Sequence, residues 1–205
     1  MAHRPQPPKC VNIAIVRIHR PTINLTERLE VIIHDLCARI PEFAHINPRR
    51  LLVCVARTRS TRAAGAFAKI IPMRFPDGSP MRTVRDQLFS LPQIPTVDGD
   101  VLYLIYVYLP RFFQQPFERR LLTLVHELYH IAPAFDGTIR LFGTRAHGAS
   151  REQFNDRLLP LIQYYLDTKP AEELLAILRD DLSTLSRQAT LVGRTLSVPK
   201  AIKLK

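Results

Sequence analysis

The residues best suited to chemistry are the two histidines and the glutamate of HELYH, residues 126–130. Side chains four positions apart lie on one face of a helix, so the imidazoles of His126 and His130 could bind a single metal ion. Zinc is the metal that this pattern typically binds, and Glu127 would then act as general base on a zinc-bound water. The motif therefore predicts a zinc-dependent hydrolase that cleaves peptide bonds.

A catalytic zinc usually has three protein ligands, so a third ligand is expected further along the chain. His147 is the leading candidate because it is the only histidine after the motif, and Gly148 lets the backbone bend toward the metal. Asp136 is an alternative, since it lies at the offset where a longer zinc-peptidase motif has its third histidine. Glu152 is another, because some zinc peptidases use a glutamate of the following helix. The residues alone leave all three open.

The elements next to the motif must hold both imidazoles rigidly. Residues 116–132 predict a largely apolar, buried helix that starts at Pro116 and ends before Pro133. Residues 101–109, VLYLIYVYL, predict a strand directly before it, and a strand beside the cleft could align an extended peptide. Burying histidine and glutamate on such a helix is costly without a partner, and a metal ion is one. This setting favours a metal over ordinary hydrogen bonds.

Periodicity predicts one α+β domain, in which a small mixed sheet packs on the motif helix and further helices follow. The expected strands cover 11–18, 51–56, 66–74 and 138–142, the last a short one, with a loop over 75–100. The expected helices cover 24–40, a segment from Ser150 that breaks at Pro160, and 171–185. The domain is expected over 11–186, between a flexible N-terminus (1–10) and a loosely ordered basic tail (187–205).

The charge balance suggests an anionic partner. The chain has 29 basic and 18 acidic residues, a net charge of +11, and such an excess favours association with nucleic acid. The stretch RTRSTR (57–62) and the tail residues Arg194, Lys200, Lys203 and Lys205 could contact phosphates, or form a solvated face. No helix-turn-helix, zinc-finger or aromatic stacking signature accompanies them, so binding would be directed at the nucleic-acid backbone.

Cysteine use and hydropathy predict a cytoplasmic protein that does not enter a membrane. Cys10, Cys37 and Cys54 form no C-x-x-C pair, which argues against a zinc ribbon and against a disulfide framework. No apolar run reaches the roughly 18–20 residues of a spanning helix. The start, MAHRPQPPK, shows no secretory signal.

The sequence LVHELYH followed by His147-Gly148 is similar to SprT-like and related small zincin metallopeptidases. The wider run from RTRSTRAAGAFAKIIPMRF through VLYLIYVYLP to HELYHIAP, roughly residues 50–155, resembles the phage-type metallopeptidases. The resemblance implies a zincin-like fold, zinc ligands His126, His130 and His147, and catalytic Glu127. The chain departs from many SprT-like proteins in lacking a cysteine zinc ribbon, and the resemblance implies no particular substrate.

Two questions stay open at the level of sequence. The first is the group that steadies an oxyanion, for which the candidates are Tyr103, Tyr106, Tyr108, Tyr129 and Arg145. The second is the function itself, since a basic nucleic-acid-associated protein with a structural zinc is an alternative to a peptidase of proteins or peptides. A protease that acts on DNA-bound proteins or on one repressor would combine features of both.

Overall fold

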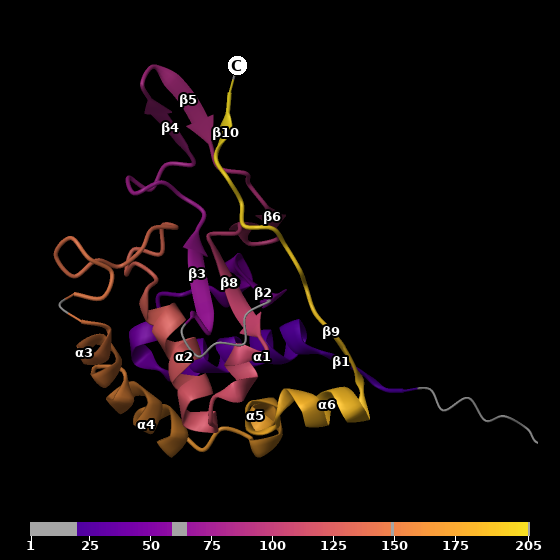
Figure 1. The fold of residues 1–205 in the computed structure, drawn as a ribbon. Coiled ribbons are helices and arrows are strands. Elements are labelled where there is room, and N and C mark those ends of the chain that lie inside the picture. The colour runs from indigo at the N-terminus through magenta and orange to yellow at the C-terminus, as the bar shows by residue number, and fades with distance from the viewer. Residues whose placement is uncertain (1–19, 59–64, 149, 205) are drawn as a thin grey trace, which may run out of the picture.

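The computed structural model describes residues 20–58, 65–148 and 150–204. The strand predicted at 11–18, the N-terminal segment 1–10 and most of the RTRSTR stretch lie outside these residues. Within them the chain forms an α+β structure with several helices and small sheets (Figure 1). None of its helices in the described ranges has the length and apolar character needed to cross a membrane.

A three-stranded sheet lies at the centre, in the order β2 (Leu51–Arg57), β8 (Tyr103–Leu109) and β3 (Ala68–Pro72). Strand β2 runs parallel to β8, whereas β3 runs antiparallel to it, with Ile70 opposite Ile105. Every residue of β8 except Tyr108 is buried, which is typical of a strand paired on both sides. The predictions of strands at 51–56, 66–74 and 101–109 are confirmed, and Pro72 lies on an edge strand, where its missing N–H is tolerated.

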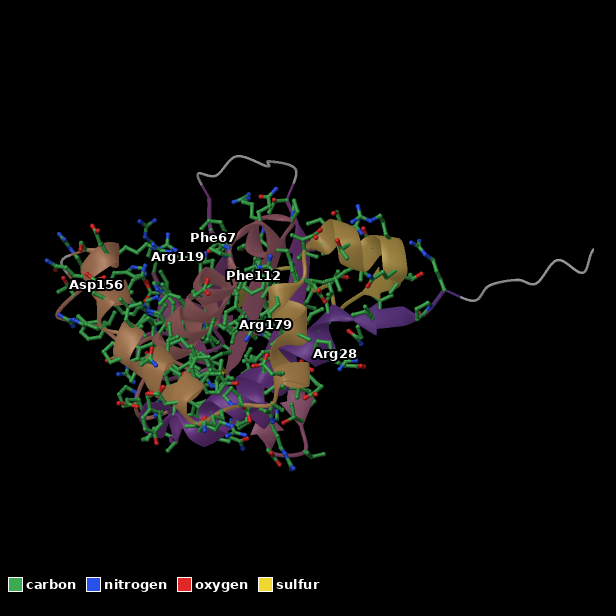
Figure 2. All side chains as sticks on the ribbon, turned by 90° about the horizontal axis from the view of Figure 1, so that it is seen from below. Arg28, Phe67, Phe112, Arg119, Asp156 and Arg179 are labelled. Carbon is green, nitrogen blue, oxygen red and sulfur yellow. The ribbon has the colours of Figure 1, made fainter. Side chains whose placement is uncertain are left out.

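Two helices cover the same face of this sheet, α1 (Leu25–Arg39) and α2 (Phe117–Tyr129). The Asn24 side chain caps α1 by accepting hydrogen bonds from two backbone N–H groups, as its sequence position predicts. Helix α2 begins after Pro116, close to the predicted boundary. Side chains fill the space between these helices and the sheet (Figure 2), and Phe112, which is labelled there, is fully buried.

Four shorter helices follow α2. They are α3 (Arg151–Asp156), α4 (Leu159–Asp167), α5 (Glu172–Arg179) and α6 (Leu182–Gln188). The helix start at Ser150 and the break at Pro160 are confirmed, since Ser150 Oγ accepts from the Gln153 N–H and Pro160 lies in the first turn of α4. The single helix predicted over 171–185 is wrong. Asp181 begins a new helix there by accepting from the Thr184 N–H.

The rest of the described chain forms short elements. Strand β1 (Thr22–Asn24) pairs with β9 (Thr190–Val192) in parallel, and a small sheet has the order β10–β5–β4. The strands of this small sheet are β4 (Met81–Val84), β5 (Gln87–Ser90) and β10 (Ile202–Lys203). A separate hairpin consists of β6 (Pro95–Thr96) and β7 (Gly99–Asp100). Short 3₁₀ helices cover Pro41–Phe43, Pro48–Arg50 and Arg111–Gln114.

Three sequence predictions differ from this arrangement. The expected loop over 75–100 contains two hairpins, and the expected loose tail supplies β9 and β10 to other strands. The short strand expected at 138–142 is absent from the described residues, where Ile139 and Phe142 form only isolated bridges. The tail strands depend on pairing with distant residues, which local periodicity does not report, whereas the two hairpins pair neighbouring residues across the turns at 85–86 and 97–98.

Arg120 joins the start of α2 to the end of α5. Its buried guanidinium donates to the carbonyl oxygens of Gln115 and Leu178 at 2.7 and 2.9 Å, and also to those of Phe113 and Asp180. The side chain therefore satisfies carbonyl groups at the ends of separate elements, which would otherwise lack partners.

We expect Arg120→Ala to lower the free energy of unfolding by about 3 kcal/mol, because buried carbonyl groups lose a charged donor. The matched control is Arg119→Ala, which removes an exposed arginine from the neighbouring position (Figure 2) and should change stability by less than about 0.5 kcal/mol. Urea denaturation of both variants measures the difference. Equal stabilities would contradict the assigned role.

Candidate metal centre

Three histidine side chains converge on one point. His126 Nε2 lies 3.0 Å from His130 Nε2 and 3.1 Å from His147 Nε2, and the last two nitrogens are also 3.1 Å apart. His126 and His130 are 5% exposed, and His147 is half-buried. Among the described residues, these three form the group of histidine, cysteine and carboxylate side chains able to hold a metal ion together.

The geometry and the chemistry of the three nitrogens fit a metal ion. Nitrogens bound tetrahedrally to one zinc at about 2.0–2.1 Å lie roughly 3.3 Å from one another, close to the separations found here. A neutral imidazole has one N–H donor and one nitrogen lone pair. Where three Nε2 atoms face one another without an N–H between them, their lone pairs repel unless a cation lies at the centre. The cluster is therefore a good donor set for zinc.

The main chain places the three rings from two segments. His126 lies in the last turn of α2, and His130 directly follows that helix while keeping a right-handed helical conformation. His147 comes from the following loop, where Gly148 has a φ of +67°, a conformation that favours glycine. The Tyr103 hydroxyl fixes the start of this loop by accepting from the Gly137 N–H and donating to the Thr138 carbonyl oxygen.

Two residues of α3 hold the histidines in place, and the sequence analysis missed both. His126 Nδ1 lies 2.7 Å from Asn155 Oδ1, so a proton on Nδ1 is donated to the amide and Nε2 keeps its lone pair. The buried ring of Phe154 packs against all three imidazoles, with centroid distances of 4.7, 4.9 and 5.1 Å to His126, His130 and His147. The one sequence signal for Phe154 and Asn155 was the predicted helix start at Ser150, which puts both residues on the helix that follows His147.

Burial keeps the histidines in the neutral form that binds metal. Desolvation lowers the pKa of His126 to about 4 and that of His130 to about 3, and it also lowers the pKa of His147. The nearby Arg151 guanidinium acts in the same direction on all three, because it repels an imidazolium. The Asn155 amide partly opposes the shift at His126.

Glu127 follows His126 in the chain, is buried, and is bound to the edge strand of the central sheet. Its Oε2 accepts a hydrogen bond of 2.8 Å from the backbone N–H of Ile70 in β3. Burial raises the pKa of Glu127 to about 7, while that hydrogen bond and the charges of Arg151 and Lys69 act in the opposite direction. The carboxyl group is therefore poised between its two protonation states near neutral pH.

The two alternative third ligands do not join the cluster. Asp136 is exposed, and its Oδ1 accepts from the N–H and hydroxyl of Thr138, which stabilises the turn after α2. Glu152 is exposed in the first turn of α3, where a carboxylate interacts favourably with the helix dipole. The structure thus brings His147, and neither carboxylate, to His126 and His130.

The five candidates for oxyanion stabilisation have different surroundings. The Tyr103 hydroxyl is engaged by the loop after α2, and the buried Tyr106 hydroxyl lies on the opposite face of the sheet from α2. Tyr129 packs against Phe154 and beneath the Arg140 guanidinium, and Arg145 is exposed. Tyr108 is half-buried, and the charge of Glu127 contributes to its raised pKa after burial itself. Tyr108 also packs against the cluster around Tyr106, on the face of the sheet opposite α2, so its hydroxyl is not placed among the three histidines.

The surroundings of the cluster are cationic. The charged groups that act on the histidines are Arg151 and, at His130, also Arg140, whereas Lys69 and Arg151 act on Glu127. Arg140 is fixed close by, because its backbone N–H donates to the His130 carbonyl oxygen at 2.7 Å. A cavity of about 1790 Å³ lies elsewhere, between β2, η3 (Arg111–Gln114), α6 and β9. It contains no residue of the cluster.

Comparison with protein-family models, with curated proteins and with solved structures gave no match. The resemblance to small zincin metallopeptidases therefore rests on HELYH and His147 alone. The three-dimensional structure supports the same three histidines as metal ligands, because the fold brings His147 to His126 and His130.

We expect Asn155→Ala to weaken zinc binding by about 10–100-fold, because the His126 ring loses the acceptor that fixes its orientation and tautomer. Gln153→Ala removes an exposed amide from the same helix and should leave the affinity unchanged. A competition titration with a chromogenic chelator measures both dissociation constants. Similar affinities for the two variants would show that the 2.7 Å contact does not support the metal site.

Proposed function

We propose that the chain is a zinc-dependent metallopeptidase with a zincin-like arrangement, in which His126, His130 and His147 hold the metal and Glu127 is the general base. The observation that carries the proposal is the convergence of three imidazole nitrogens, each about 3 Å from the other two, with a buried carboxyl group on the same helix as two of them. A structural zinc site needs no such carboxyl group and usually has four protein ligands. Three ligands and a base fit catalysis better.

When bound, zinc supplies Lewis acidity that polarises a peptide carbonyl and acidifies water. The chain supplies the proton transfers. Glu127 takes the proton of the attacking water and then delivers it to the leaving amine, which a carboxyl group close to the reacting atoms can do. Asn155 keeps the His126 proton on Nδ1, and Phe154 excludes water from one side of the cluster.

Strand β3 could align the substrate. It is the edge of the central sheet, and the Ile70 N–H points away from β8, because it donates to Glu127. In an antiparallel strand the N–H and C=O of one residue point to the same side, so the Ile70 carbonyl faces the same way. An extended peptide can pair with such an edge. The strand at 101–109, which the sequence analysis placed in this role, is unsuitable because β8 is paired on both sides.

The proposal includes a protein or peptide substrate and a reducing, cytoplasmic setting. Cys37 and Cys54, the cysteines of the described residues, are both free and buried, which suits such a compartment.

We expect Glu127→Gln to abolish hydrolysis of a mixed peptide library while leaving zinc binding intact, with a loss in kcat of at least about 100-fold. His147→Ala should lose both zinc and activity, because two ligands hold the metal weakly. His34→Ala, at an exposed position of α1, is the matched control and should change neither. Metal content by mass spectrometry and peptide cleavage by chromatography measure these outcomes.

Equal cleavage by wild type and Glu127→Gln would contradict a peptidase function. Zinc binding without any cleavage that depends on Glu127 would instead favour a structural metal in a nucleic-acid-associated protein. Absence of stoichiometric zinc in the wild type would overturn both.

The cationic surroundings predict a preference for acidic peptides. We expect Arg151→Ala to lower kcat/KM by roughly fivefold, about 1 kcal/mol, for peptides with Asp or Glu next to the cleaved bond, and less for neutral ones. Arg28→Ala, at an exposed position of α1 (Figure 2), should affect both classes equally. Paired assays with matched acidic and neutral peptides measure the ratio. An unchanged ratio in Arg151→Ala would contradict this preference.

A further inference from the structure

The small β10–β5–β4 sheet stands at one end of the molecule, away from helices α3–α6 (Figure 1). Its strands come from two distant parts of the chain, because β10 lies close to the C-terminus and pairs with the β4–β5 hairpin. Both faces are largely uncovered. One face is apolar, with Met81, Leu88 and Ile202 exposed by 47, 38 and 57%.

The other face carries a row of three residues of a different kind. Arg82 lies opposite Phe89 in the β4–β5 pair, and Lys203 lies opposite Phe89 in the β10–β5 pair. Directly opposed residues of neighbouring strands lie on the same face of a sheet. Neighbouring strands of a sheet are about 4.8 Å apart. The side chain of Phe89 therefore lies between Arg82 on one neighbouring strand and Lys203 on the other.

None of the three residues has an evident structural role. Arg82 and Lys203 are exposed, and neither makes an ion pair with another described residue. Phe89 is half-buried, but it packs against neither of the two apolar clusters of the protein. An aromatic side chain on a peripheral sheet that stabilises no core is free to contact a ligand.

The charge around the row is mostly positive. Arg85 lies in the turn between β4 and β5, and Lys200 lies just before β10. In the segments 79–91 and 198–204, Asp86 is the one acidic residue. The sheet therefore presents four basic side chains against one carboxylate, a strong local attraction for a polyanion.

We propose that this face of the β10–β5–β4 sheet binds single-stranded nucleic acid, with a base stacked on Phe89 and phosphates bound by Arg82 and Lys203. An aromatic platform between cations is the arrangement by which sheets bind single strands without sequence preference. A duplex offers no free base faces, so it cannot use the ring. An acidic protein would match the charge, but it has no comparable use for an aromatic ring between the two cations.

The binding site is independent of the proposed peptidase function, since no residue of the metal centre takes part. It also explains why the sequence shows no aromatic nucleic-acid signature. Phe89 and Lys203 are 114 positions apart in the chain and meet only through the pairing of β5 with β10. A protein with both sites could act on substrates near nucleic acid.

The test is fluorescence anisotropy of a labelled oligodeoxythymidine with the full chain at several salt concentrations. We expect the wild type to bind, Phe89→Ala to bind about tenfold more weakly, and Phe89→Trp to bind at least as well as the wild type. The Arg82→Ala/Lys203→Ala variant should bind more weakly and reduce the salt slope by about 1.4, because two phosphate contacts are lost. Phe89→Trp also keeps the test valid if Phe89→Ala does not fold.

The matched control is Arg28→Ala/Arg119→Ala, which removes two exposed arginines from helices far from the sheet and should retain most of the affinity. Equal weakening by the two double variants would overturn the site. So would absence of binding by the wild type, or duplex DNA competing as well as the single strand. Displacement of the oligonucleotide by polyglutamate at equal charge concentration would instead identify an acidic protein as the partner and contradict the proposal.

Discussion

The mutual orientation of three neutral imidazoles is the constraint on which the rest of the site depends. Nitrogens that lie 3.0–3.1 Å apart with lone pairs directed at one another are unfavourable alone and favourable around a cation. Holding them there requires rigid support from several elements. Helix α2 fixes two rings, a loop turned at Gly148 brings the third, and Phe154 packs against all of them.

A second connection joins this cluster to the central sheet. The hydrogen bond from Ile70 to Glu127 uses a backbone group that an edge strand would otherwise leave free, and it orients the carboxyl group. The remaining backbone groups of that edge are those with which a substrate is proposed to pair. The sheet therefore serves both as the support for α2 and as the surface where a peptide would be aligned. Metal binding, proton transfer and substrate alignment meet where α2 approaches β3.

Local signals in the sequence predicted the elements that the site needs. HELYH located α2, Asn24 and Ser150 marked true helix starts, and Pro72 marked an edge strand. Signals that depend on distant partners were invisible. Asn155 becomes a support for His126 only when α3 folds against α2, and the tail becomes strands only by pairing with β1 and β5. The helix break at Asp181 was misread because apolar spacing continued across it, although an N-cap residue was present.

His126, His130 and His147 are proposed to bind one zinc ion together. X-ray absorption at the zinc edge of the purified full chain tests this proposal most directly, because imidazole and sulfur ligands have different scattering signatures. We expect one zinc per chain with three imidazole ligands at about 2.0–2.1 Å, a further light atom and no sulfur. A spectrum with a zinc–sulfur distance of about 2.3 Å, or with fewer than three imidazoles, would contradict it.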